Sequence, residues 1–155
     1  MVIADEKLYA ATAGSEGGGL RIFDISRPHD LVQIDSYNSD CQYTLDLALS
    51  DDGKTVYLGC GNGLQVLDVS NPEQPKLLGK SPKSKAQVDS IAVSDNHLYI
   101  SEGTTLKVLN VQNLQKLVLL MSYQLPFPSS RLRVLDDKLY AFIGDGGMAV
   151  FTITR

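Results

Sequence analysis

A short segment with the same order of apolar and polar positions occurs four times along the chain. Each copy has an apolar residue second, two bulky apolar residues fourth and fifth, and a β-branched residue seventh. The copies span residues 19–26, 63–70, 105–112 and 147–154. Successive side chains of a β-strand point to opposite faces of its sheet, so adjacent bulky residues predict a strand that is buried on both faces.

Two further features keep the same spacing. An apolar residue followed by tyrosine precedes each copy, with the tyrosines at positions 9, 57, 99 and 140. Acidic turn sequences precede these pairs and contain Asp5, Glu6, Asp51, Asp52, Asp95, Asp136 and Asp137. The leading apolar residues of the four segments are separated by 44, 42 and 42 residues. The three features indicate an internal repeat with a period of about 42 residues.

One period predicts four strands in succession, which in the second repeat cover residues 44–50, 54–60, 64–69 and 76–80. A loop with Pro72 and Pro75 precedes the last of them, because proline is excluded from helix interiors and central strands. No part of the chain has a helical period with caps. The glycine-rich stretch 14–19 is interpreted as an enlarged turn, since a strand rather than a helix follows it.

The predicted fold is therefore all-β, a β-propeller of four-stranded antiparallel blades. A single domain contains repeats at roughly 1–43, 44–86, 87–127 and 128–155. The first repeat keeps only residues 1–4 of its inner strand and the last lacks an outer strand, which leaves about three and three-quarter blades.

Three arrangements accommodate such an incomplete ring. The chain closes as a four-bladed ring, it pairs with a second copy to form an eight-bladed ring, or it is part of a larger propeller. An open stack exposes the apolar outer faces of its end blades. The sequence does not decide between the three.

The second repeat resembles a known family. Its residues 63–75, GLQVLDVSNPEQP, are similar to the core of the LVIVD repeat, which forms propellers in bacterial and archaeal proteins. Residues 50–57, SDDGKTVY, resemble the related YVTN-type repeat. The third repeat departs from the pattern at Asn110 and Leu114, where Asp and Pro are expected. The resemblance implies a propeller with a binding or scaffolding role, and it supplies no shared catalytic residues.

Composition narrows the functional classes. The 155 residues include 18 acidic and 14 basic side chains, for a net charge of −4 and a pI near 5.0, which argues against nucleic acid as a partner. The longest apolar runs have five residues, so no membrane span is predicted. The N-terminus lacks the basic and apolar regions of a signal peptide, whereas the family resemblance favours a secreted or cell-surface protein. The compartment stays open.

Residues for disulfide or metal chemistry are few. Cys41 and Cys60 lie 19 residues apart without a CxxC motif, and His29 and His97 are distant from both. We therefore predict neither a disulfide framework nor a zinc site, and no cofactor. The acidic residues lack calcium-loop spacing. Because aspartate side chains accept hydrogen bonds from nearby amides in turns, we interpret them as turn residues.

Polar residues at the predicted mouth of the central channel are the candidate ligand-binding site. They are Tyr43, Asp46, Gln87, Asp89, Arg131 and Arg133. Asp46, Ser90 and Arg131 occupy equivalent positions of successive repeats. Mixed polar side chains facing a channel are suited to a ligand with an acidic group, and are equally compatible with ion pairs that line a water-filled pore.

The sequence contains no nucleophile elbow, and both histidines fall in predicted turns. We therefore predict a non-enzymatic propeller module that binds a protein or small ligand, as a segment of a larger or homo-oligomeric propeller. One alternative is a hydrolase or lyase with a metal held at the channel mouth by Asp46 and Asp89. Another is a sugar-binding propeller, although the chain has no Trp and only Tyr43 and Tyr123 as exposed stacking surfaces.

Overall fold

The computed structural model is an all-β structure, which confirms the predicted fold class. It describes residues 1–155 except 14–17, 28, 42, 82–85, 145–146 and 154–155, so most of the predicted turn at 14–19 lies outside the described residues. No helix in the described part of the chain has the length and hydropathy needed to cross a membrane.

The strands form four antiparallel sheets in which sequence neighbours are also spatial neighbours. The first contains β1 (Val2–Ala4), β2 (Lys7–Thr12), β3 (Gly19–Asp24) and β4 (Val32–Asn38). The second contains β5 (Thr44–Leu49), β6 (Thr55–Cys60), β7 (Gly63–Asp68) and β8 (Lys76–Lys80). The third contains β9 (Ser90–Ser94), β10 (His97–Glu102), β11 (Thr105–Asn110) and β12 (Val118–Gln124). The fourth contains β13 (Ser129–Leu135), β14 (Lys138–Ile143) and β15 (Gly147–Thr152).

The acidic residues between the first two strands of each sheet form turns. Asp5, Glu6, Asp95 and Asp136 have positive φ angles of 47°, 57°, 52° and 53°, a conformation that aspartate adopts more readily than most residues. In the second sheet Oδ1 of Asp52 accepts hydrogen bonds from the Ser50 hydroxyl at 2.6 Å and the Lys54 amide at 3.1 Å. These carboxylates therefore shape the hairpins.

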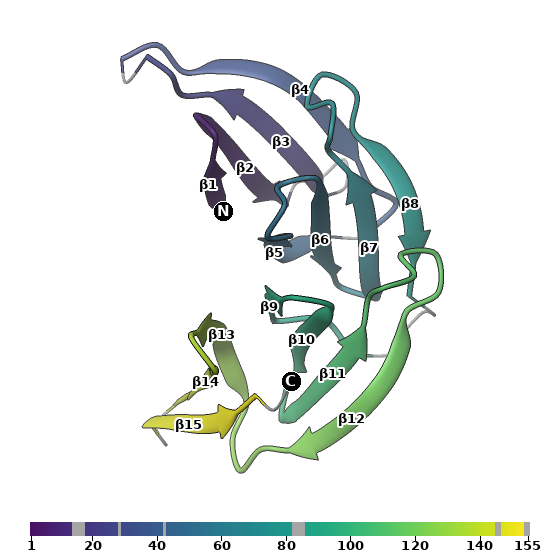
Figure 1. Cartoon of the computed structure of the whole chain (residues 1–155), viewed down its shortest axis with the longest axis vertical. Coiled ribbons are helices and arrows are strands. Elements are labelled where there is room, and N and C mark those ends of the chain that lie inside the picture. The colour runs from purple at the N-terminus through teal and green to yellow at the C-terminus, as the bar shows by residue number, and fades with distance from the viewer. Residues whose placement is uncertain (14–17, 28, 42, 82–85, 145–146, 154–155) are drawn as a thin grey trace.

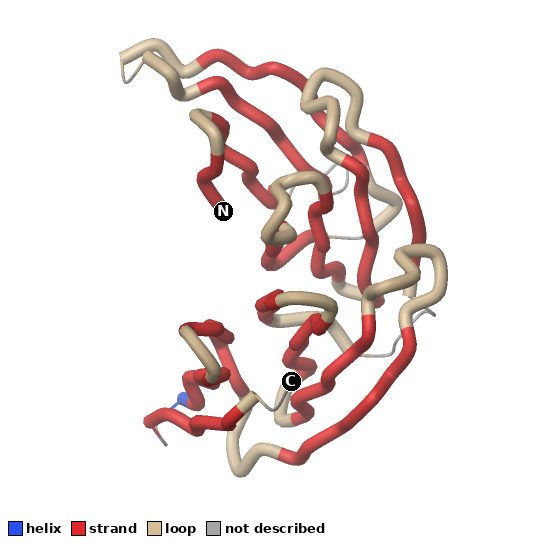
Figure 2. Tube along the Cα trace, viewed as in Figure 1, coloured by secondary structure: helices blue, strands red, loops and turns tan. Residues whose placement is uncertain are grey.

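The four sheets are arranged around a common centre as propeller blades (Figure 1). The inner strands β1, β5, β9 and β13 lie towards the centre, and β4, β8 and β12 lie along the outer rim. The first and fourth sheets lie at the two ends of the arc, with the ring open between them (Figures 1 and 2).

Each junction between sheets is an apolar layer. We call the face that a sheet turns to the following sheet its leading face, and the opposite face its trailing face. The leading face of the second sheet carries Ala48, Tyr57, Leu64 and Val66 and packs against Ile91, Leu98, Ile100 and Leu109. The trailing face of the second sheet carries Leu47, Val56, Leu58 and Leu67 and packs against Tyr9, Leu20 and Ile22. The third junction joins Tyr99 and Leu106 to Leu132, Leu139 and Ala141. Because one such buried side chain contributes about 1.5–3 kcal/mol, these layers are the main source of stability.

The second and third sheets approach closely at one position of β6, where the leading face has a residue without a side chain. A Cβ atom added to Gly59 would lie 3.0 Å from Cγ1 of Val88 and 3.1 Å from Cδ1 of Ile91. Ser101 holds the equivalent position in the third sheet and is fully buried. The glycine therefore permits the close contact of the second and third sheets at this point.

The two cysteines form a disulfide, so the prediction of no disulfide framework is wrong. Cys41, in the connection between the first and second sheets, is bonded to Cys60 at the end of β6, with their Cα atoms 5.5 Å apart. The spacing of 19 residues gave no sign of this pairing. The pairing depends on how the chain returns to the centre after the outer strand β4.

Removal of this disulfide is expected to lower the free energy of unfolding by about 3 kcal/mol, because a loop of this size is no longer closed in the unfolded chain. Urea unfolding of the wild type with and without a thiol reductant measures the effect, and the Cys41→Ser/Cys60→Ser double variant is the control that reductant should not alter. An unchanged urea midpoint after reduction would contradict the prediction.

A second prediction concerns Tyr57, whose pKa burial raises to about 12, with smaller contributions from Asp52 and Asp51. In the unfolded chain tyrosine ionises near pH 10, so the unfolded state loses this proton first. The stability contributed by Tyr57 is therefore complete below about pH 10 and is lost as the pH rises towards about 12. The free energy of unfolding, measured across this pH range, should fall more steeply with pH in the wild type than in Tyr57→Phe. Equal slopes would count against this assignment.

Candidate functional site

The predicted channel-mouth residues lie near the inner strands of the last three sheets. Tyr43 precedes β5, Asp46 lies in β5, Gln87 and Asp89 precede β9, and Arg131 and Arg133 lie in β13. The structure brings the first four into two hydrogen-bonded groups, whereas the two arginines join neither.

Tyr43, Gln87 and Asp89 form a hydrogen-bonded chain from the second sheet to the third. The Tyr43 hydroxyl donates to Oε1 of Gln87 at 3.3 Å, and Nε2 of Gln87 donates to Oδ1 of Asp89 at 2.6 Å. Oδ2 of Asp89 accepts from the Gly103 amide at 2.7 Å, in the turn between β10 and β11. This chain fixes the connection that leads into β9.

Asp46 joins the second sheet to the backbone of the third. Its Oδ2 accepts from the Ser90 hydroxyl at 2.8 Å and from the Ile91 amide at 3.0 Å. The Ser90 oxygen in turn accepts from the Leu132 amide of the fourth sheet at 2.9 Å. Asp46 and Ser90 occupy equivalent positions in the second and third sheets. Each therefore accepts a hydrogen bond from a backbone amide of the following sheet, and these two amides are equivalent as well.

Arg131 holds this equivalent position in the fourth sheet. A guanidinium group has only donors, so Arg131 is unable to accept a bond from a further backbone amide. Arg133 stands where the second and third sheets have Ala48 and Ala92, by the register of the inner strands. Both arginines are exposed, and no side-chain partner is found for either among the described residues. They place two positive charges on the leading face of the fourth sheet.

Buried hydroxyls contribute bonds that the sequence did not indicate. Oγ of Ser101 donates to the Ser129 carbonyl at 3.2 Å, linking the third and fourth sheets. Oγ1 of Thr44 donates to the carbonyl of Thr12, linking the first and second. A small polar residue within a strand that is otherwise apolar on both faces is the signal for such a bond.

A further polar cluster lies beside the disulfide. Nζ of Lys80 is 2.7 Å from Oδ2 of Asp40, and this hydrogen-bonded ion pair lowers the pKa of Asp40 and raises that of Lys80. The buried Gln65 amide donates to the same carboxylate. The pair ties β8 to the connection before β5.

Most of these groups form a hydrogen-bonded network that links the sheets. The two arginines form an exposed charged patch beside it. The oxygens of Asp46 and Asp89 already accept hydrogen bonds from the protein. Over the ranges that the structure describes, no group of three or more His, Cys, Asp and Glu side chains is placed to hold a metal ion. The unpaired donors of Arg131 and Arg133 are suited to an acidic group.

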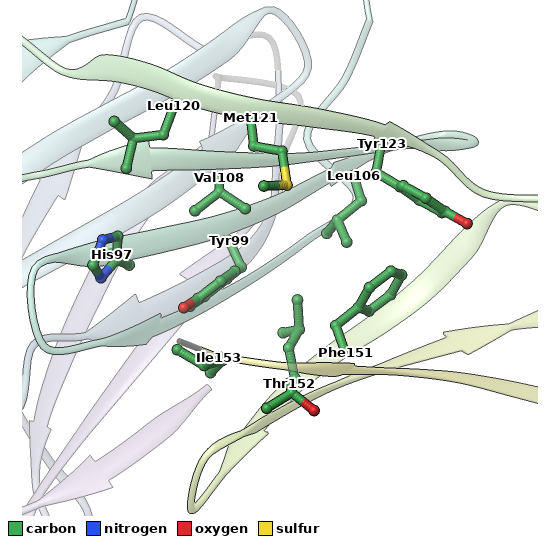
Figure 3. A pocket seen from close by; sticks show the side chains of 11 residues that line it. His97, Tyr99, Leu106, Val108, Leu120, Met121, Tyr123, Phe151, Thr152 and Ile153 are labelled. Carbon is green, nitrogen blue, oxygen red and sulfur yellow. The ribbon is translucent and has the colours of Figure 1, made fainter. Parts of the chain in front are cut away.

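An apolar groove lies away from the channel, between the third and fourth sheets (Figure 3). Its volume is about 270 Å³, and its lining includes Val108, Met121 and Tyr123 on one side and Phe151 and Ile153 on the other. The rings of Tyr123 and Phe151 make an edge-on contact, with centroids 5.2 Å apart. No pattern in the sequence indicates this groove.

The role of Asp46 is testable by substitution. Asp46→Ala leaves the Ile91 amide without its acceptor and is expected to cost about 1–3 kcal/mol of stability. Asp46→Asn retains an oxygen acceptor and should cost less. Arg133→Ala, at an exposed site, is the control and should change the free energy of unfolding by no more than about 0.5 kcal/mol. Urea denaturation measures all three, and wild-type stability in Asp46→Ala would refute this role for the carboxylate.

Comparison with solved structures supports the propeller fold. The crystal structure of the computationally designed Ika4 protein is 17% identical in sequence, with a TM-score of 0.71 over 98% of this chain and 88% of that chain. The computationally designed Ika8 protein is 18% identical, with the same TM-score of 0.71 over 98% of this chain but 44% of that one. The chain therefore spans less than half of the length of Ika8. No curated protein sequence matches the chain.

Comparison with family models gives two matches to the LVIVD repeat. They cover residues 43–81 and 86–124, which together make up half of the chain. These ranges contain the second and third sheets, where the repeat pattern and the blade structure coincide. The chain belongs to the LVIVD-repeat family, and it is folded as blades of a β-propeller.

Proposed function

We propose that the chain is a non-enzymatic β-propeller module that binds a protein or small ligand, and that a second copy of the chain completes its ring. The observation that carries the proposal is the exposure, on both end sheets, of apolar faces whose counterparts are buried at the internal junctions.

The leading face of the fourth sheet is exposed. Met148 and Val150 are each 48% exposed. The residues equivalent to Met148 are Leu20, Leu64 and Leu106, none of which is more than 3% exposed. Ile22 and Val66, equivalent to Val150, are completely buried. An uncovered apolar face of this kind marks an interaction surface.

The trailing face of the first sheet is exposed in the same way. Ile3 is 62% exposed and Leu31 is 59% exposed. Leu49 and Val93, the equivalents of Ile3, pack against the apolar layers of the first and second junctions. Leu117, the equivalent of Leu31, packs against the second layer. Because a leading face contacts a trailing face at every internal junction, a second copy offers each end of the chain its usual neighbour.

Two copies related by a two-fold axis would form two identical seams and bring together eight sheets, within the range of known propellers. Phe142 stands where the second and third sheets have Gly59 and Ser101, so the leading face of the fourth sheet carries a larger side chain at this position.

The binding surface in this proposal is the channel mouth beside the seam. Arg131 and Arg133 lie on the leading face of the fourth sheet, so the ring would place both at the seam. Two exposed guanidinium groups favour an acidic group on the ligand.

Light scattering on a sizing column tests the ring. The wild type is expected at about twice the chain mass of 16.9 kDa. Met148→Glu/Val150→Glu places two charges in the seam and is expected to give the mass of one chain. Leu77→Glu, on the outer strand β8 at a site that is 40% exposed, is the control and should keep the mass of the wild type.

Two outcomes would refute the completed ring. One is a wild-type monomer that unfolds cooperatively at all concentrations. The other is a dimer that persists in the double variant, because its interface would then lie elsewhere.

A further inference from the structure

We propose that a small polar pocket on the second sheet binds one ordered water molecule, which donates a hydrogen bond to Oε1 of Gln65 and accepts one from the ammonium group of Lys80. The pocket is lined by these two residues and Asp40, next to Cys60 of the disulfide. The second sheet has a neighbouring sheet packed on each of its faces (Figure 1). The proposal is therefore independent of the ends of the arc and of the completion of the ring.

Gln65 brings a buried acceptor into the second sheet. The residue lies in β7 and is 3% exposed, and its Nε2 donates to Oδ1 of Asp40. Oε1 of the same amide is buried and has no hydrogen-bond partner among the described residues. Removal of an acceptor from water without a new bond is costly. The large majority of buried polar atoms are accordingly bonded either to protein or to ordered water.

Asp40 fixes the orientation of this amide. If the amide were reversed, Oε1 would face the carboxylate of Asp40, and neither oxygen is a donor. The neighbouring backbone does not supply a donor, since the Leu64 amide donates to Oγ of Ser81 and the Ser81 amide donates to the Leu64 carbonyl, each at 2.9 Å. Oε1 of Gln65 therefore has a fixed direction and a bond still to make.

The internal repeat places different groups at this position. By the strand register, Arg21 and Lys107 are the equivalents of Gln65 in the first and third sheets. Their side chains carry only donors. Nη1 of Arg21 donates to the Leu20 carbonyl at 3.1 Å, and Nζ of Lys107 lies 2.5 Å from Oε2 of Glu102. Gln65 thus adds an acceptor that these two sheets do not have at the same position.

The pocket has the size and the charge that suit a water molecule. Its volume is about 30 Å³, and a cavity holds a water molecule once it has about 10–15 Å³. Nζ of Lys80 lies 2.7 Å from Oδ2 of Asp40, so the two charges offset each other. A further cation would meet the ammonium group of Lys80. The occupant is therefore small, neutral and a hydrogen-bond donor.

A water molecule at this place gains partners on two strands. Gln65 and Lys80 bind the two oxygens of one carboxylate, so the amide and the ammonium group lie side by side. The ammonium group has three N–H donors, and its bond to Asp40 uses one of them. Buried waters typically make about three hydrogen bonds. This water would join β7 to β8, beside the connection that contains Cys41.

High-resolution crystal structures of the wild type and of Gln65→Met test the proposal. Methionine has a similar length but only a weak acceptor in its thioether. In the wild type we expect a water oxygen about 2.8 Å from Oε1 of Gln65. In the variant we expect no water at this place.

Oxygen-17 relaxation dispersion of the solvent counts long-lived water molecules in solution. The amplitude in Gln65→Met should be smaller than in the wild type by the contribution of one water molecule. Lys80→Met removes the second partner of the water and should also lower the amplitude. Lys76→Met, at the other end of β8, is the matched control and should keep the wild-type amplitude. A thermal unfolding transition shows that each variant is folded.

Three results would overturn the proposal. One is a wild-type crystal structure in which Oε1 of Gln65 accepts its bond from a protein group. Another is a cation at this place, recognised by several oxygen atoms around it at coordination distances. The third is an equal dispersion amplitude in the wild type and in folded Gln65→Met.

Discussion

Each sheet of this protein packs an apolar face against the next sheet, and the remaining features of the structure follow from that packing. The central strands β6 and β7 are buried on both faces, so their stability depends on two neighbours. A four-stranded sheet with two apolar faces is not stable in water by itself, and repeat proteins gain stability largely at such interfaces. Gly59 shows how close the contact is, because an added Cβ atom would lie only 3.0 Å from Val88, just before β9, and 3.1 Å from Ile91 of β9.

The polar network at the inner strands is a consequence of the same contact. Two sheets that approach closely leave backbone amides of the following sheet away from water, and a buried amide without an acceptor is costly. Asp46 supplies the acceptor for Ile91, and Ser90 supplies it for Leu132. Asp46, which was predicted from the sequence as a ligand-binding residue, therefore has a role in the packing of the sheets. Arg131 and Arg133 are the exposed part of the predicted site, and neither side chain has a partner among the described residues.

The strands were predictable because their signal is local and repeated. Residues 44–50, 54–60, 64–69 and 76–80 were expected as strands, and β5 to β8 lie within a residue or two of these limits. The disulfide was not predictable, since the 5.5 Å between the Cα atoms of Cys41 and Cys60 depends on the path of an irregular connection. The sequence aligned Asp46, Ser90 and Arg131 correctly by register. It carried no information on which backbone amide each side chain meets, because that partner lies in another sheet.

The leading face of the fourth sheet departs from the internal repeat at two positions. With a small residue at Phe142 and alanine at Arg133, the leading face of the fourth sheet would match those of the internal junctions. The larger and charged residues at these two positions make the end face different from its internal equivalents at its inner part. The outer part, with Met148 and Val150, keeps the repeat pattern. The departures from the repeat thus lie near the inner strand of the fourth sheet, whereas the apolar residues of β15 keep the pattern that packs against a neighbouring sheet elsewhere in the chain.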